Sequence, residues 1–196
     1  MSTEVMTLKV RFSYPNVIEP QKSQNSNDVK YGITLLIPKS DTVTLGKIKA
    51  AVKEARDNFC KRNGANALPL EPITTLYDGD GVKPNSGEPR GPECKGHWVL
   101  TCSSKKKPLV VDEFGTVISG PNVECTNPNV IYPGCYGRAK VNFYGYSNQR
   151  KGIGCGLLGI KKLCDGEPLG GSYASASDFD DGYVDPEAGA NDDIFG

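Results

Sequence analysis

The stretch that decides the fold is Tyr136-Gly137-Arg138-Ala139-Lys140-Val141-Asn142-Phe143-Tyr144-Gly145-Tyr146, in which two kinds of side chain alternate. Ala139, Val141 and Phe143 occupy every second position and would face a hydrophobic core. The positions between them would face solvent, and they hold Arg138, Lys140, Asn142, Tyr144 and Tyr146. Because an alternation of period two is typical of a half-buried β-strand, the stretch predicts a strand that covers a core on one side.

The rest of the chain also favours strands. Its 23 Gly and 14 Pro residues require frequent turns, which are typical of β structure. Five further segments have the composition of strands, namely Thr7–Tyr14, Tyr31–Ile37, His97–Ser103, Leu109–Val111 and Gly152–Leu163. In the first of them, Leu8, Val10 and Phe12 would face the core and Pro15 would end the strand. The last would pair with the 136–146 strand across a turn.

One segment predicts a helix. Ser40 or Asp41 can cap its first turn, and Gly64 can end it. The apolar residues between these limits recur at helical spacing, and they are Leu45, Ile48, Val52, Ala55 and Phe59. We therefore expect a single surface helix packed on the sheet.

Residues 64–96 are rich in Gly, Pro and charge and predict a long, mobile loop. The run Asp78-Gly79-Asp80-Gly81 superficially resembles a calcium loop, but the acidic ligand expected several positions later is missing. We expect no ion there and assign the loop no function.

A net charge of zero conceals an asymmetric distribution. Residues 172–196 contain no Lys or Arg, and their seven carboxylates are Asp178, Asp180, Asp181, Asp185, Glu187, Asp192 and Asp193. The other 171 residues carry 23 basic and 16 acidic side chains, a net charge of +7. We expect a folded domain over residues 1–171 and a disordered acidic tail over 172–196. A basic body with an acidic tail is typical of proteins that bind nucleic acid, although such a tail can also serve only solubility.

The cysteines and the absence of long apolar runs point to a reducing compartment. Seven Cys residues form no even-numbered disulfide framework, and we expect reduced thiols that act mostly as small core residues. The chain opens without an apolar signal segment, and no run approaches the roughly 18 apolar residues of a membrane span. We expect a cytoplasmic protein with no membrane partner.

Residues suited to catalysis are scarce. His97 is the only histidine, and phosphate-binding, dinucleotide-binding and nucleophile-elbow motifs are missing. Cys94, His97 and Cys102 could supply three zinc ligands, but a second ligand pair with regular spacing is lacking. We expect no enzyme, no metal and no cofactor. A metal-dependent nuclease using Asp78 and Asp80 remains a weaker alternative.

The polar face of the 136–146 strand suits an unpaired nucleic-acid strand. Cations neutralise phosphates, and aromatic rings stack on bases of any identity. Arg138, Lys140, Tyr144 and Tyr146 supply both on one face, although an ordinary polar sheet face is the alternative. The neighbouring strands and turns extend the predicted nucleic-acid site, and they add Lys9, Arg11, Trp98, Lys105, Lys106, Lys107, Lys161 and Lys162.

Four stretches resemble a family of phage proteins that bind single-stranded DNA and are compared with the helix-destabilising protein of T7-type phages. They are Arg11-Phe12-Ser13-Tyr14-Pro15-Asn16-Val17, Leu35-Leu36-Ile37-Pro38-Lys39, Gly134-Cys135-Tyr136-Gly137-Arg138-Ala139 and Asp165-Gly166-Glu167-Pro168-Leu169-Gly170-Gly171. No single stretch is diagnostic, but their order and spacing over residues 8–171 are fairly specific. The resemblance implies an OB-fold, a five-stranded Greek-key barrel that binds oligonucleotides across one face.

The resemblance also implies a role in phage DNA replication and recombination, inside a bacterial host cell. In the T7-type protein an acidic tail ending in an aromatic residue covers the DNA cleft and contacts replication partners such as the phage DNA polymerase. Here Asp192, Asp193 and Phe195 would take that part, although Gly196 follows the aromatic residue.

Taken together, the sequence predicts sequence-tolerant binding and protection of single-stranded DNA. A structural or interaction protein of a virion is the main alternative. Whether the chain forms a homodimer stays open.

Overall fold

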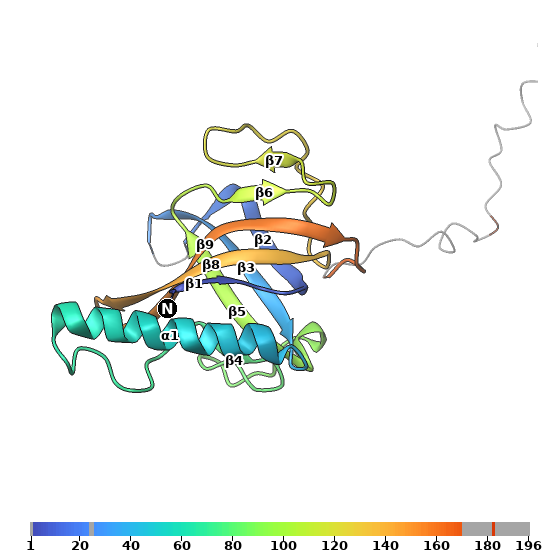
Figure 1. Ribbon diagram of the computed structural model, residues 1–196. Coiled ribbons are helices and arrows are strands. Elements are labelled where there is room, and N and C mark those ends of the chain that lie inside the picture. Colours follow the sequence, from blue (N-terminus) through green and yellow to red (C-terminus); the bar gives the residue numbers. More distant parts are fainter. Residues whose placement is uncertain (1, 24–25, 170–181, 183–196) are drawn as a thin grey trace, which may run out of the picture.

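The computed structural model describes residues 2–23 and 26–169 together with Gly182. Within them lie nine strands, one α-helix and one short 3-10 helix (Figure 1). The strands are β1 Glu4–Met6, β2 Val10–Lys22, β3 Val29–Pro38, β4 Leu76–Asp78, β5 His97–Ser104, β6 Leu109–Val111, β7 Val117–Ser119, β8 Tyr136–Ser147 and β9 Lys151–Cys164. The helices are α1 Thr42–Asn63 and the 3-10 helix η1 Pro92–Cys94. The tail predicted from residue 172 falls, except for Gly182, outside the described residues.

Five strands close into a ring. β2 pairs with β3, β3 with β5 and β8 with β9, all antiparallel, whereas β5 and β9 run parallel. The ring closes where Val10 and Arg11 of β2 pair with Gly137 and Tyr136 of β8. The expected mainly β fold with a five-stranded barrel and one helix is therefore confirmed. The other four strands extend this framework, β1 on β8, β4 on β5, β6 on β9 and β7 on β6.

The ring surrounds one main hydrophobic core. The predicted inward residues of β8, namely Ala139, Val141 and Phe143, are all buried in it. The largest side chains that the core buries completely come from several strands and include Phe12, Leu35, Ile37, Leu100, Ile153 and Leu157. Because residues at every second position of a strand share a face, the residues between them line the outside of the barrel.

Helix α1 covers one end of the barrel beside β8 and β1, as Figure 1 shows. An Asp41 carboxylate oxygen accepts a hydrogen bond from the Thr44 backbone N–H at 2.9 Å, so the predicted cap is confirmed. The buried stripe is rotated slightly from the predicted one, and it consists of Thr44, Ile48, Ala51, Ala55 and Cys60. The rotation brings the Thr44 hydroxyl within 3.0 Å of the Leu8 backbone N–H, from which it accepts a hydrogen bond.

The first long strand differs from the prediction at both ends. Leu8 precedes β2 and is exposed rather than facing the core, because pairing with β8 begins only at Val10. Pro15 does not end the strand. Instead the register of β2 against β3 shifts between Ser13 and Asn16, and the strand continues to Lys22. A bulge of this kind accommodates Pro because it releases a residue from the hydrogen-bonded ladder.

Five of the seven cysteines are buried, as expected for small core residues. Cys102 and Cys155 face each other in the core with their sulfurs 3.4 Å apart. As for membranes, no helix in the described part combines enough length with enough apolar character to cross one.

The segment 64–96 is not structureless, because it contributes β4 and η1 and adds β4 to the edge of β5. Its turn at residues 78–80 is held to the barrel by Lys39. The Lys39 ammonium lies 2.7 Å from an Asp78 oxygen and 2.6 Å from an Asp80 oxygen. Hydrogen bonds from Lys39 lower the pKa of both carboxyls below the ordinary value of 3.8.

We expect Lys39→Met to destabilise the protein more than Lys53→Met, which removes an exposed helical pair with Asp57. Because the folded protein lowers the pKa of Asp78 and Asp80, their contribution to stability is complete above pH 3.8 and is lost as the pH falls below it. Urea unfolding at several pH values should therefore show a lower free energy of unfolding for Lys39→Met than for the wild-type chain at pH 7. This difference should narrow below pH 4. A difference independent of pH would contradict this account.

Candidate nucleic-acid interface

Small residues line the outside of the barrel where β2, β3, β5 and β9 lie side by side. One row across the strands pairs Ser13 with Thr34 and Thr34 with Thr101. The next row joins Asn16, Gly32, Ser103 and Gly156 in the same way. We call this surface the small-residue floor, and it consists of Ser13, Gly32, Thr34, Thr101, Ser103, Gly154 and Gly156. None of these seven positions carries a large side chain. Ser13 and Gly154 are buried, and at the other five positions an extended chain can lie close to the strands.

Tyr144 stands at one side of the small-residue floor. It projects from β8 across β9, where its ring covers Gly154, and the side chain remains 46% exposed. A Cβ atom on Gly154 would lie only 2.6 Å from the Tyr144 Cζ atom, so a side chain there would displace the ring. Partial burial raises the pKa of the Tyr144 hydroxyl. Tyr146 occupies the corresponding place over Gly152, two residue pairs nearer the turn.

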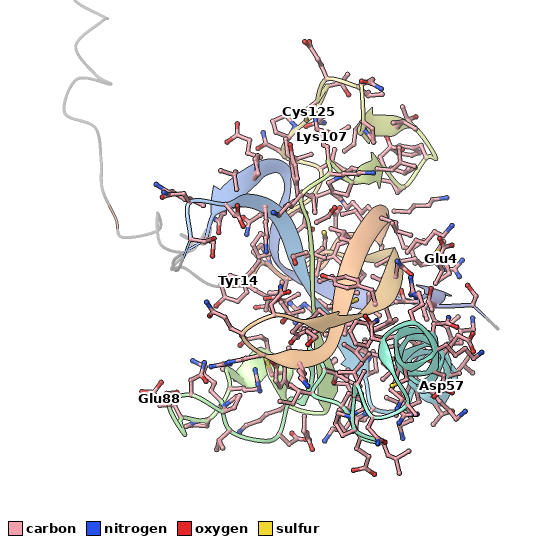
Figure 2. All side chains as sticks on the ribbon, turned by 90° about the vertical axis from the view of Figure 1, so that its left-hand side faces the viewer. Glu4, Tyr14, Asp57, Glu88, Lys107 and Cys125 are labelled. Carbon is pink, nitrogen blue, oxygen red and sulfur yellow. The ribbon has the colours of Figure 1, made fainter. Side chains whose placement is uncertain are left out.

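Tyr14 is the second exposed ring next to the floor. It directly follows Ser13 at the bulge of β2 and is 72% exposed. Its φ of 46° lies in the left-handed region, which costs a non-glycine residue about 1–3 kcal/mol and is typical of functional sites. In Figure 2 Tyr14 and Glu88 lie on the same side of the molecule.

Predicted cations surround this region, but several already have partners. Lys9 and Arg11 lie 5.0 and 5.6 Å from the centre of the Tyr136 ring, and Arg11 also donates to the Gly134 and Glu167 carbonyl oxygens. At the far end of β5, Lys105 lies 3.5 Å from Asp28, and Lys107 donates to the Val123 carbonyl oxygen. Lys106 is exposed beside them.

Trp98 lies apart from the other residues predicted to bind DNA. Its ring packs against the main core, and the Lys39 ammonium lies 5.2 Å from the ring centre. It also sits at the opposite end of β5 from Lys105 and its neighbours. The outer face at that end is instead covered by a separate small cluster formed by Leu36, Cys94 and Val99 with Tyr77 and Leu169.

The other predicted cations of β8 face a second surface. Arg138 pairs with Lys161 of β9, and these two side chains and Lys140 border a cleft that contains Met6, Leu109 and Leu158. We call it the cationic cleft. The single cationic and aromatic face predicted for residues 138–146 is therefore divided, with the tyrosines beside the floor and the cations at the cleft.

Lys162 is buried rather than exposed with the other cations, contrary to the prediction. Its ammonium lies 2.6 Å from Asp165 and 5.2 Å from the centre of the Tyr132 ring. Lys161 and Lys162 are consecutive, and consecutive strand residues point to opposite faces. Lys162 therefore joins the end of β9 to Asp165 and Tyr132, and its buried ammonium is not available to DNA.

Comparison with known proteins identifies the family. The family model described as "Enterobacter phage Enc34, ssDNA-binding protein" matches residues 3–193. The chain belongs to this family. It is also 34% identical over 178 residues to protein p50 of Acyrthosiphon pisum secondary endosymbiont phage 1, covering 88% of this chain and 90% of that protein. The resemblance noted in the sequence is thus confirmed.

Solved structures give the same result. The single-stranded DNA-binding protein of bacteriophage Enc34, in complex with ssDNA, is 27% identical with a TM-score of 0.72, covering 86% of this chain and 90% of that one. The gp2.5 protein of bacteriophage T7, a single-stranded DNA-binding protein, is 15% identical with a TM-score of 0.56, covering 93% and 96%. At that identity the second likeness shows the fold alone.

Membership of the Enc34-type family of binding proteins confirms that the chain is not an enzyme. The geometry of the candidate catalytic and metal residues agrees. Asp78 and Asp80 are both paired with the Lys39 ammonium and hold the 78–80 turn to the barrel. Cys102 points into the main core whereas Cys94 packs in the outer cluster, so these two cannot bind one metal ion.

The sequence contained signals for the floor that its alternation alone did not reveal. The repeated glycines of Gly152-x-Gly154-x-Gly156 are one such signal, because they leave room for the rings of Tyr146 and Tyr144. Tyr14 before Pro15 was expected only to end a strand. The exposure of its ring depends on the bulge of β2 against β3, for which the sequence alone held no signal.

We expect Gly154→Ala to be tolerated and Gly137→Ala to be strongly destabilising. The new Cβ at 154 meets the end of a movable ring, whereas the Cβ at 137 would lie 2.2 Å from the Lys161 backbone oxygen and 2.5 Å from Phe12. Urea unfolding should show that the free energy of unfolding falls by less than about 1 kcal/mol for Gly154→Ala and by more than about 3 kcal/mol for Gly137→Ala. A shift of the Tyr144 ring signals in the NMR spectrum of Gly154→Ala would show that the ring has moved. Equal losses would contradict this.

Proposed function

We propose that this chain binds single-stranded DNA across the small-residue floor, with little dependence on sequence. The observation that carries the proposal is the placement of two exposed rings, Tyr14 and Tyr144, beside a surface without large side chains. Stacking on an aromatic ring is possible for every base, because each base has a flat face. The Enc34 relative that was solved in complex with ssDNA supports the same choice of ligand.

Charge supports an unpaired, negatively charged ligand. Outside the tail the chain carries a net charge of +7, which favours phosphates. Lys9, Arg11, Lys105 and Lys106 lie around the predicted path and would neutralise phosphates while the rings hold bases. A duplex buries its bases, so it could use only the cations and should bind less tightly.

The finer roles of the chain follow as proposals. Binding of this kind protects the strand and removes its secondary structure, which suits phage DNA replication and recombination. The acidic tail would compete with DNA for the floor and recruit replication proteins such as a DNA polymerase. Leu169 bears on the competition, because it packs against the cluster of Leu36, Cys94 and Val99 on the outer side of β3 and β5. The small-residue floor lies on the same side of these two strands, beyond that cluster.

We expect Tyr14→Ala and Tyr144→Ala each to weaken binding to single-stranded DNA by about 1–3 kcal/mol, the usual loss for a stacking ring. Phe114→Ala is the matched control, because Phe114 is 86% exposed but lies in the turn between β6 and β7. Fluorescence titration with labelled single strands, duplex and RNA of equal length, in several salt concentrations and with or without Mg²⁺, provides the measurement.

The logarithmic salt slope should be about −0.7 per neutralised phosphate. No binding to any of the nucleic acids would favour a structural virion protein, and cleavage in Mg²⁺ would favour a nuclease. Normal binding by both tyrosine variants would place the DNA elsewhere on the barrel.

We expect neutralisation of the tail to tighten DNA binding at low salt. The variant replaces each Asp or Glu of residues 172–196 by its amide, which keeps the length and the aromatic residues. Covalent attachment to the basic body keeps these seven carboxylates at a high effective concentration near it. Because salt screens the attraction, the gain in affinity should shrink at high ionic strength. Unchanged affinity at both salt concentrations would mean that the tail does not compete with DNA.

A further inference from the structure

A tight hairpin projects from the barrel between β4 and η1, in the segment to which the sequence assigned no function. Val82 pairs with Pro89 across the hairpin. The Lys83 N–H donates a hydrogen bond to the Glu88 carbonyl oxygen at 2.8 Å, and the Gly87 N–H donates to the Lys83 carbonyl oxygen at 2.9 Å. These bonds give the hairpin a defined shape of its own.

The base of the hairpin is tied to the barrel. The Gly79 N–H donates to the His97 carbonyl oxygen at 2.9 Å, and an Asp80 carboxylate oxygen accepts from the Gly96 N–H at 3.0 Å. In Figure 2, Glu88 of this hairpin lies on the same side of the molecule as Tyr14. The hairpin is therefore held on the side of the barrel where one of the two proposed stacking rings is exposed.

Arg90, the residue after the Val82–Pro89 pair, lacks a counterion. Its guanidinium carbon lies 4.7 Å from the centre of the Tyr77 ring, so the cation is held over the face of an aromatic residue. Its Nε atom is buried and has no hydrogen-bond partner among the residues that the structure describes. No carboxylate of residues 2–23 and 26–169 forms an ion pair with it. Because a half-buried charge without a partner is unfavourable, an anion from outside would stabilise this site.

The stack of Arg90 on Tyr77 adjoins the small-residue floor. Tyr77 pairs with Val99 of β5, and Val99 pairs with Leu36 of β3. Thr101 of the floor follows Val99 by two residues along β5, and residues two apart share a face of the sheet. At the rise of a strand, two residues span about 7 Å. An extended strand of DNA that crosses the floor therefore reaches Arg90 by continuing a short way along β5.

We propose that Arg90 binds a phosphate of the single strand and that Tyr77 is the positioning residue that holds its guanidinium in place. The planar guanidinium matches a phosphate group, with which it can form two parallel hydrogen bonds. The Tyr77 ring covers one face of the guanidinium, and the two terminal amino groups provide these donors. The inference rests on the proposed function and extends the DNA path from the floor to the hairpin.

The salt dependence of DNA binding tests this contact. Arg90→Met keeps a side chain of similar length beside Tyr77 but removes the charge. It should weaken binding to oligo(dT) about tenfold, as is typical for loss of a hydrogen bond to a charged group. It should also reduce the logarithmic salt slope by about 0.7. Arg90→Lys should restore the slope without restoring the full affinity, because lysine keeps the charge but not the planar fork.

Arg62→Met is the matched control. It makes the same chemical change at an exposed position of α1, which the proposed DNA path does not use. Its affinity and salt slope should equal those of the wild-type chain.

A second measurement follows the guanidinium itself. In full-length protein labelled with ¹⁵N at its six arginines, the Nε–H signal of Arg90 is identified by its loss in Arg90→Lys. Addition of oligo(dT) should shift this signal, because a phosphate then binds the neighbouring amino groups. The Nε–H signal of Arg62, which donates to the Asn58 carbonyl oxygen at 3.2 Å, should stay in place.

The outcomes separate this inference from the proposed function. If Tyr14→Ala and Tyr144→Ala weaken binding but Arg90→Met keeps the wild-type salt slope, DNA crosses the floor without reaching Arg90 and the inference is overturned. An Arg90 signal that stays in place at saturating DNA, or an equal loss of slope in Arg62→Met, would also overturn it. A reduced slope in Arg90→Met with normal binding by both tyrosine variants would support the Arg90 contact and reject the floor. Binding to no nucleic acid would overturn both.

Discussion

Closure of the barrel at one crossing is the constraint on which the rest of the molecule depends. β8 meets β2 over only two paired positions, and Gly137 lies at that crossing. The Phe12 ring and the Lys161 carbonyl oxygen occupy the space that a side chain at 137 would take. Without this close approach the ring of five strands would open, the core would lose its cover, and no continuous outer surface would connect β2 with β9.

Closure also explains why one strand serves two surfaces. β8 is paired along nearly its whole length with β9, and a register shift between Lys140 and Val141 marks where the pair bends. Before the shift, Arg138 and Lys140 border the cationic cleft with β1 and β6. Beyond it, Tyr144 lies over Gly154 beside the small-residue floor. A small barrel must curve sharply, so outward residues of one long strand cannot all face the same direction.

The sequence was most informative where the deciding interactions are local. Alternation in residues 136–146 predicted both the strand and its buried side, and Asp41 with Gly64 predicted both ends of α1. It was least informative where contacts between strands far apart in the chain determine how a side chain is placed. The separation of Arg138 from Tyr144 follows from curvature, and the burial of Lys162 follows from its contacts with Asp165 and Tyr132. The exposure of Tyr14 follows from a bulge against β3, which no local pattern specifies.

The position of β9 in the chain has a consequence for the order in which the protein folds. This last strand of the described fold pairs with β5, β6 and β8 at once, and to β5 it is joined through a single pair, Ser103 with Gly156. The ribosome must therefore complete residue 164 before the barrel can close, and until then β5 and β8 present unpaired edges and apolar faces. Such non-local pairing is slow and prone to aggregation.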